Sequence, residues 1–339
     1  MNLTPIVLYN NTLSATPASF QQMLTIPANA SINSTYTNIR FRDGNYKLLT
    51  SWLESYTTSS ATIWVVLPDG IPSKSAITIY METGSLSDNF LDGVTVGEAP
   101  QLSATYGQYD NGAKVFDFYE NFVGTSLPSG WNSGAVSGSS VTVNNGLTIS
   151  GNGVTAGSTY AATNNVVFTN NEILEAYINQ NDAVTLGERG MIGISTVNNA
   201  EPLWDNVGGA GDTIAGWSAG KNGIASVIQS ETVLDGSTAY LNSISSNSNW
   251  NIYSVALSSA NGVTTFVNYG SVSPASSTTS DNPSAPLYVN TGVYNTGSGS
   301  SFDLQYAWLR VRAYPPSGTM PLQVNKTGSI INIAEGLII

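Results

Sequence analysis

Residues 216–220 read Gly-Trp-Ser-Ala-Gly and match the G-x-S-x-G pattern that holds a nucleophilic serine between a strand and a helix. A serine in this role needs a histidine nearby to take its proton. The chain of 339 residues contains no histidine, and no strand–turn–helix pattern surrounds Ser218. We therefore expect no catalytic role for Ser218.

Two glutamates in the stretch EILEAYI, Glu172 and Glu175, come nearest to a pair of catalytic carboxylates. A glycosidase needs both of its carboxyl groups in one cleft. On a strand, residues three apart point to opposite faces of the sheet. The spacing therefore indicates exposed strand charges, and it predicts that the chain is not an enzyme.

Carboxylates in loops are also ligands that Ca²⁺ prefers. No EF-hand-like spacing occurs, however, and aspartates in loops commonly shape turns. Cysteine and histidine are absent, which excludes thiolate and imidazole metal sites. The sequence predicts no cofactor and leaves Ca²⁺ as the open alternative. The candidate ligands are Asp92, Asp110, Asp117, Asp182, Asp205, Asp212, Asp281 and Asp303.

Aromatic side chains in or near loops are candidates for stacking on sugar rings, because an indole packs well on the apolar face of a pyranose. The competing interpretation is that they belong to the core, where most tryptophan surface is buried. Both interpretations stay open. The candidates are Trp131, Trp204, Trp217, Trp250 and Tyr294.

The charge balance excludes one class of partner. The chain carries 22 acidic and 10 basic residues, a net charge of −12, and only 9% of its residues are charged. A negative surface repels phosphate backbones, so we expect no binding of nucleic acid. The remaining partners are other copies of the chain, other surface or virion proteins, and surface glycans.

Sequons for N-glycosylation cluster near the two ends of the chain and suggest an extracellular, cell-surface or virion-surface location. The first residues show no signal peptide, so the chain either has lost one or leaves its cell without one, as virion proteins can. The sequon asparagines are Asn2, Asn10, Asn29, Asn33 and Asn325.

Short runs rich in β-branched and aromatic residues, separated by Asn-Gly and Asp-Gly pairs, predict antiparallel sheets without long helices. In residues 302–312 the apolar residues change parity, from Phe302 to Trp308 on one face and from Leu309 on the other. This change predicts a β-bulge near Trp308, or a strand whose second half is covered on both faces. We expect an all-β protein.

The composition changes near residue 113, and three prolines lie between residues 314 and 321. These boundaries predict two antiparallel β-sandwich (jelly-roll-like) domains, residues 1–113 and 114–316, followed by a hydrophobic tail, 317–339. The tail either completes a sheet of its own chain or adds as a strand to a neighbouring chain. The residues assigned to this assembly tail are Ile330, Ile331, Ile333, Leu337, Ile338 and Ile339.

Residues 5–115 resemble a family of unknown function that is common in archaeal and bacterial surface proteins. The resemblance depends on FQQMLTI, on YTNIRFRDGNYKLLTSWLES and on IWVVLPDGIPSKSAITIYMETGS. The segment at Tyr80–Gly84 departs from the Tyr-Tyr-Gly ending usual in that family. The resemblance implies a β domain and no activity.

Residues 114–316 resemble a concanavalin-like, laminin-G-type jelly roll. The resemblance depends on FDFYENFVGTSLPSGWN, NNGLTISGNG and LQYAWLRVRAYPP. The pair of domains resembles proteins of thermoacidophilic archaea and of their viruses. It implies an extracellular pair of β-sandwiches, and because this fold hosts many functions it implies no particular activity.

These observations together predict a non-enzymatic structural or attachment protein of a cell or virion surface. It would assemble through strand pairing of its tail or mediate adhesion. A glycan-binding module is the alternative, and a carbohydrate-active enzyme is a more distant one.

Overall fold

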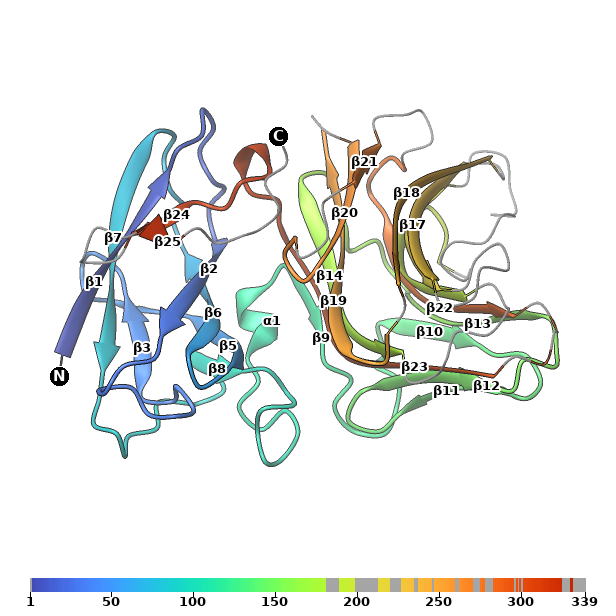
Figure 1. Cartoon of the computed structure of the whole chain (residues 1–339), viewed down its shortest axis with the longest axis horizontal. Helices are drawn as coiled ribbons and strands as arrows, with labels where there is room; N and C mark the ends of the chain where they lie inside the picture. The colour runs from blue at the N-terminus through green and yellow to red at the C-terminus, as the bar shows by residue number, and fades with distance from the viewer. Residues whose placement is uncertain are drawn as a thin grey trace. The chain divides into compact units, whose positions relative to one another are not determined.

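The computed structural model is almost entirely β (Figure 1). It separates into two compact units, Met1–Tyr119 with Pro315–Ile339, and Glu120–Tyr314, called here the first and the second sandwich. The residues that the structure describes are 2–180, 189–198, 213–219, 227–234, 237–245, 247–259, 262–270, 275–277, 283–295, 297, 299, 301–324 and 330–331.

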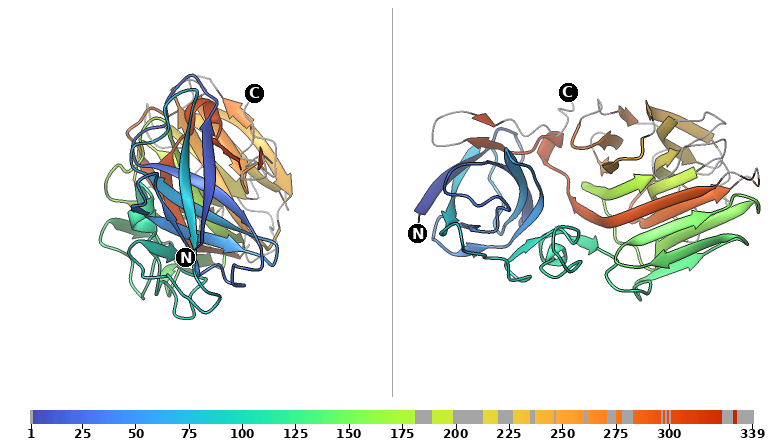
Figure 2. Two further views of the ribbon diagram at one scale, coloured as in Figure 1. Left: turned by 90° about the vertical axis from the view of Figure 1, so that its left-hand side faces the viewer. Right: turned by 60° about the horizontal axis from the view of Figure 1, so that its bottom comes forward.

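The first sandwich contains a six-stranded sheet and a four-stranded sheet, and the right-hand view of Figure 2 looks nearly along its strands. In the six-stranded sheet the order is β25 (Ile330–Ile331), β24 (Leu322–Val324), β1 (Asn2–Asn10), β7 (Ser75–Thr83), β3 (Ile39–Arg42) and β4 (Leu48–Leu49). In the other it is β2 (Phe20–Pro27), β6 (Ser60–Leu67), β5 (Ser51–Tyr56) and β8 (Val96–Glu98). Described pairings are antiparallel except that of β5 with β8.

Two tryptophans form the centre of the first core. Trp52 of β5 lies directly opposite Trp64 of β6, and both are fully buried. The ring of Phe116 meets them edge-on, with centroids 5.3 Å from Trp52 and 5.8 Å from Trp64. A buried indole N–H needs an acceptor. Asp110 accepts from Trp52 at 2.9 Å and Glu54 accepts from Trp64 at 2.8 Å.

The second sandwich stacks a seven-stranded sheet on an eight-stranded one. The first has the order β10 (Trp131–Gly134), β13 (Gly157–Thr163), β22 (Tyr288–Asn295), β15 (Arg189–Ser195), β16 (Thr213–Ala219), β17 (Val227–Leu234) and β18 (Ser237–Ser245). Seven strands of the second follow the order β11 (Ser139–Val143), β12 (Leu147–Gly151), β23 (Phe302–Ala313), β14 (Glu172–Gln180), β19 (Trp250–Ser258), β20 (Gly262–Val267) and β21 (Ala275–Ser277), and the eighth, β9 (Phe118–Glu120), lies off this order. The all-β class and the sandwich architecture predicted from the sequence are confirmed.

The parity change in β23 is a β-bulge. Tyr177 of β14 pairs with Trp308 and the next residue, Ile178, pairs with Tyr306, so Ala307 has no partner across this ladder. Before the bulge Tyr306 points inward, where its hydroxyl donates to the carbonyl of Met191 at 2.6 Å. After it Leu309 and Val311 are buried, and so are Arg310 and Arg312 of the opposite face. The structure therefore contains both the β-bulge near Trp308 and a second half of the strand that is covered on both faces.

The units differ from the expected division in two places. The first sandwich extends to Tyr119 rather than 113, since Phe116 packs on its tryptophans. The short helix α1 (Gly112–Val115) and the strand β9 (Phe118–Glu120) lie at this boundary. Pro315–Ile339 belongs to the first sandwich instead of forming a separate tail, because β24 pairs with β1. The 3₁₀ turn η2 (Pro316–Gly318) precedes β24.

Candidate functional site

Glu175 of β14 is the centre of a buried ionic cluster with Arg310 and Arg312 of β23. Arg310 lies directly opposite Glu175, and Arg312 follows two residues later on the same face. Arg310 Nε donates to Glu175 Oε2 at 2.7 Å, while Arg312 donates to both carboxylate oxygens, at 3.0 and 2.8 Å. All three side chains have no exposed surface. We call these residues the Glu175 cluster.

The expectation that Glu172 and Glu175 are exposed strand charges is wrong for Glu175. Burial by itself would raise the pKa of Glu175, but the charges of Arg310 and Arg312 outweigh burial and hold that pKa below its ordinary value. Glu172 is half-buried at the start of the strand and accepts a hydrogen bond from the backbone of Thr169. The two carboxylates do not converge on one cleft, because their spacing of three separates their faces.

Two of the proposed sugar-stacking aromatics are core residues. Trp217 is fully buried, and its indole donates to the carbonyl of Ser254 at 2.9 Å. Trp131 is 6% exposed and packs on Phe122, with ring centroids 5.2 Å apart. Neither ring offers a free face to a sugar, so these two predictions are corrected. Trp204 lies outside the described residues.

Trp250 is the candidate aromatic that does reach the surface. Its side chain is 38% exposed and lies against Tyr177, with ring centroids 4.9 Å apart. Tyr177 in turn stacks on buried Trp308 at 5.6 Å, and the guanidinium of Arg310 lies 4.6 Å from the Trp308 ring centroid. This aromatic row, Trp250, Tyr177 and Trp308, therefore continues into the Glu175 cluster. Tyr294, the last candidate, is half-buried in β22.

Sequence reasoning missed Tyr177, although a signal existed. Tyr177 lies two residues from Glu175 in the same strand, and side chains two apart on a strand share a face. The pairing of Tyr177 with Trp308 follows from the register of β14 on β23, which the sequence alone does not supply.

The aspartates proposed as calcium ligands serve local structure where they are described. Asp92 accepts three backbone N–H groups, from Val94, Thr95 and Val96, at 2.7–2.9 Å. Asp110 accepts from the Trp52 indole and from the Tyr119 hydroxyl. Within the described part of the chain, no three acidic, histidine or cysteine side chains gather as metal ligands would.

Two other calcium candidates have amide partners. Gln21 donates to Asp117 at 3.1 Å, and Gln305 donates to Asp303 at 3.2 Å. The remaining candidates, Asp182, Asp205, Asp212 and Asp281, lie outside the described residues. Calcium binding stays an untested prediction.

The sequon asparagines have different environments. Asn10 is fully buried, which corrects its assignment as a glycosylation candidate. Asn33 is half-buried, and Asn2 and Asn29 are exposed. Asn325 lies outside the described residues.

The described part of the tail pairs within its own chain. Leu322–Val324 pair with β1, and Ile330–Ile331 pair with β24 at the end of the sheet. Gln323 is fully buried, and its amide bonds both the N–H and the carbonyl of Thr25 at 3.0 Å. The other tail candidates, Ile333, Leu337, Ile338 and Ile339, lie outside the described residues.

The Gly-Trp-Ser-Ala-Gly motif runs along β16, so Ser218 is in a strand rather than at a strand–helix turn. Gly220 lies outside the described residues. None of the helices in the described ranges is long and apolar enough to cross a lipid bilayer.

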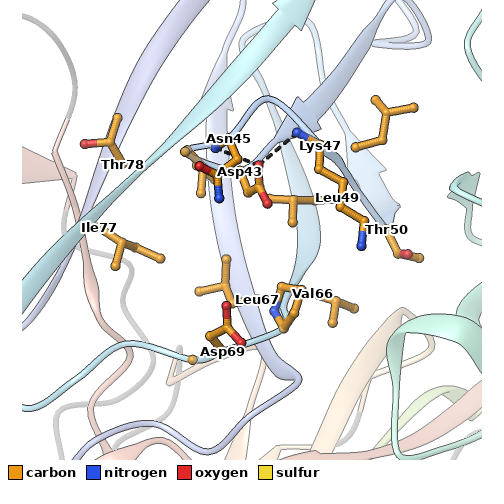
Figure 3. A pocket seen from close by; sticks show the side chains of 15 residues that line it. Asp43, Asn45, Lys47, Leu49, Thr50, Val66, Leu67, Asp69, Ile77 and Thr78 are labelled. Carbon is orange, nitrogen blue, oxygen red and sulfur yellow. Dashed lines mark hydrogen bonds between the residues drawn. The ribbon is translucent and has the colours of Figure 1, made fainter.

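A pocket of about 710 Å³ lies in the first sandwich, and Figure 3 shows the side chains that line it. The turn between β3 and β4, the end of β6 and the start of β7 enclose it. Its wall includes aliphatic side chains, among them Leu49, Leu67 and Ile77, and its rim carries Asp43 and Asp69. Among the described residues that line it, none is aromatic, and polar side chains such as Lys47 and Thr78 lie beside the aliphatic ones. The described lining therefore offers no ring for stacking on sugars, and the sequence did not predict the pocket.

Part of the first sandwich matches a known family model. Residues 35–99 match a domain of unknown function, DUF2341. The match lies inside residues 5–115, where the sequence resembles a family of unknown function. The lining of the pocket, residues 43–79, lies inside the match.

A relative covers nearly the whole chain. It is described as "Uncharacterized protein 562" of Sulfolobus islandicus rod-shaped virus 1, and it is 29% identical over 371 aligned residues. The alignment covers 98% of this chain and 61% of that protein, so the chain spans less than two thirds of its relative's length.

Solved structures of related shape are more distant. A glycosyl hydrolase family protein from Mycobacterium fortuitum is 15% identical with a TM-score of 0.42, over 58% of this chain and 99% of the other. A β-glucanase from Bacillus licheniformis is 14% identical with a TM-score of 0.42, over 57% and 97%. Residues 35–99 of this chain thus match the model of DUF2341, a domain of unknown function, and a relative that matches nearly all of the chain is a viral protein.

Proposed function

We propose that this chain is a non-enzymatic structural or attachment protein at the outer surface of a virion, and that it assembles through strand pairing at a sheet edge. The relative encoded by a rod-shaped virus supports the association with virions. The two β-sandwiches are compatible with a structural role, since each consists of hydrogen-bonded sheets around a buried core.

The observation that carries the assembly proposal is the position of β25. Ile330–Ile331 form the last described strand of the six-stranded sheet. An edge strand presents backbone N–H and C=O groups to which another strand can bind. The segment GSIINIAEGLII holds six isoleucine or leucine residues in twelve and a single charge. An apolar sequence of this kind that continues from an edge strand favours pairing with a neighbouring chain.

Truncation after Val324 tests this assembly. It removes residues 325–339 and keeps β24, which the first sandwich needs because Gln323 is buried in it. The full chain should form oligomers by light scattering, and the truncated chain should be a monomer that still unfolds cooperatively in a thermal melt. A full-length control with Ile333, Leu337 and Ile338 replaced by serine should also be monomeric. A truncated chain of unchanged mass would disprove assembly through the tail.

The proposal that the chain is not an enzyme rests on the burial and ion pairing of Glu175, one of the two candidate catalytic carboxylates. Glu175 is held by two arginines and has no exposed surface. A general acid must reach its substrate and needs a raised pKa, whereas the pKa of Glu175 is lowered. Hydrolysis of β-glucans by the purified chain that is lost on replacing Glu175 with glutamine would overturn this view.

Glycan binding is a second candidate, favoured by the exposed ring of Trp250 supported by Tyr177. A partly exposed indole that packs on a second aromatic ring is a suitable platform for a sugar. On a glycan array, Trp250→Ala should weaken any binding at least about tenfold, or ~1.4 kcal/mol. Tyr46→Ala is a matched control, because Tyr46 is 53% exposed in the other sandwich. Binding that survives Trp250→Ala would assign the site elsewhere.

A further inference from the structure

We propose that Asn29 is the residue at which the folded chain accepts an N-linked glycan, and that Asn10 accepts none while the chain is folded. The inference deepens the proposed function, because a glycan would be added only where the surface meets a glycosylating machinery. It concerns the four sequon asparagines that the structure describes, Asn2, Asn10, Asn29 and Asn33.

Asn10 is unavailable because its amide nitrogen is part of the core of the first sandwich. The residue is fully buried, and Nδ2 donates to the carbonyls of Ser14, Ile71 and Pro72 at 2.9, 3.2 and 3.3 Å. Oδ1 accepts from both the N–H and the hydroxyl of Thr12, at 3.0 and 2.7 Å. The hydroxyl that defines this sequon is therefore occupied as well. A transferase can reach Asn10 only if this turn opens.

Asn33 is half-buried and also engaged. Its Nδ2 donates to Thr37 Oγ1 at 3.0 Å, with longer contacts to the carbonyls of Leu86 and Asp88 at 3.5 and 3.4 Å. Its Oδ1 accepts from the backbone of Thr37 at 3.0 Å. The side chain thus ties two parts of the first sandwich together, and modification would break these contacts.

Asn2 is exposed but lies in a paired strand. Residues 2–4 pair in register with Thr83, Glu82 and Met81 of β7. Sequons that are used lie in surface loops, where the backbone can leave the protein and enter the transferase. Within the ladder the backbone of Asn2 cannot do so without breaking strand pairing.

Asn29 combines exposure with a loop conformation. Asn29, Ala30 and Ser31 are all exposed in the connection between β2 and β3. Asn29 Oδ1 accepts from the backbone N–H of Ser31 at 2.9 Å, an Asx-turn that shapes the tip of the loop. No described group accepts a hydrogen bond from Asn29 Nδ2. The backbone N–H of Ala28 donates to the carbonyl of Ser59 and holds the start of the loop, while the N–H of Ile32 donates to the carbonyl of Asn29 and closes a turn within it.

The chemistry requires a polyprenyl-phosphate-linked glycan and its transferase. Asn29 Nδ2 forms a bond to the anomeric carbon of the sugar, and the bond between that carbon and the phosphate oxygen breaks. The polyprenyl phosphate leaves with the electron pair, and the amide nitrogen loses one proton to the transferase. An exposed loop allows this approach without loss of any described side-chain contact of Nδ2.

The test is glycosylation in vitro of the folded full chain by a purified oligosaccharyltransferase with a lipid-linked glycan donor. Peptide mass spectrometry should find the glycan on Asn29, with an initial rate at least about tenfold above that at Asn10. Tenfold corresponds to ~1.4 kcal/mol. A free-energy difference of this size is similar to the cost of leaving one buried amide group without its hydrogen-bond partner. After denaturation the two rates should converge.

Two variants serve as controls. Asn29→Gln should abolish the modification at this loop, and Ser31→Ala should do the same while Asn29 itself is kept. Modification of Asn10 in the folded chain, or a folded chain that stays unmodified at Asn29 while the denatured chain reacts there, would overturn the inference. Material from native virions separates this result from the proposed function. If Asn29 reacts in vitro but carries no glycan in virions, that result contradicts the proposed surface location. It leaves the assignment of Asn29 as the acceptor residue supported.

Discussion

Replacing Glu175 by glutamine keeps the shape of the side chain and removes the only negative charge of the Glu175 cluster. Arg310 and Arg312 would then face a neutral amide at the positions where they now bond carboxylate oxygens, at distances of 2.7 to 3.0 Å. Removing one partner of a buried ion pair costs about 3–5 kcal/mol, because the remaining charge is buried without compensation. For a unit of the size of Glu120–Tyr314 this corresponds to a fall in Tm of about 6–20 °C.

The pH dependence gives this prediction its sharper form. The folded-state pKa of Glu175 lies below its ordinary value, so its contribution is complete above the unfolded-state pKa, about 4.3. The contribution is lost as the pH falls through the folded-state pKa. Thermal melts by circular dichroism should therefore show a large difference between wild type and Glu175→Gln at pH 7 and a shrinking one in strong acid.

Glu172→Gln is the matched control, because it changes the same residue type in the same strand at a half-exposed position. It should lower Tm far less than Glu175→Gln at pH 7. A Glu175→Gln chain as stable as wild type at pH 7 would refute the assignment of a stabilising role to the cluster. So would a stability difference that is independent of pH.

Three further predictions concern single buried groups. Burial raises the pKa of Glu98, so ionisation of Glu98 opposes folding at neutral pH, and Glu98→Gln should raise Tm at pH 7 with a gain that disappears in acid melts. Trp217→Phe leaves the Ser254 carbonyl without its indole donor and should cost about 1–3 kcal/mol in denaturant unfolding. Gln323→Ala removes two bonds to Thr25 and should destabilise the first sandwich by a similar amount of about 1–3 kcal/mol, seen as earlier proteolysis of that unit.

The strands and the bulge could be predicted because their signals are local. The alternation of apolar and polar residues along 302–312 indicates which face of the strand is covered. One inserted residue, Ala307, shifts the apolar residues to the other face. The sandwich class follows from the same period and from the turn residues. These features depend on neighbours a few positions away, so a single sequence contains them.

The environment of Glu175 could not be predicted, because its partners lie 135 and 137 residues further along the chain. The spacing rule correctly separated Glu172 from Glu175, but it could not tell which face would be covered. A usable signal was the pair Arg310 and Arg312 in the second half of β23, whose other residues from Tyr306 on are apolar or aromatic. Two charges on one face of such a strand require a buried counter-charge, and the sequence does not say which carboxylate supplies it.

The pocket of the first sandwich escaped prediction for a related reason. Its lining combines residues of the strands β4, β6 and β7 with residues of two turns, at 43–47 and 68–70. Each of these segments reads as an ordinary strand or turn. Only their spacing in three dimensions creates the opening.

Within the part of the chain that the structure describes, each sandwich contains the same ionic arrangement. In the first, Arg40 and Arg42 of β3 bind buried Glu82 of β7 at 2.6 and 2.5 Å, and Arg40 lies 4.4 Å from the ring centroid of Phe90. Hydrogen bonding from Arg40 is the main cause that holds the pKa of Glu82 below its ordinary value. Each cluster thus has two arginines two residues apart on one strand, one glutamate opposite on the next strand, and an aromatic ring beside an arginine.

This arrangement uses four of the five arginines in a chain where only 9% of residues are charged. The arginines therefore serve mainly to neutralise buried carboxylates rather than to bind anions from solution. Because the pKa values of Glu82 and Glu175 are both lowered, the two clusters stay ionised below the pH at which free carboxylates become protonated. Each cluster therefore keeps its stabilising contribution until the pH falls through the lowered pKa of its glutamate. Exchanging either glutamate for glutamine removes that contribution and should raise the pH at which acid unfolds that sandwich.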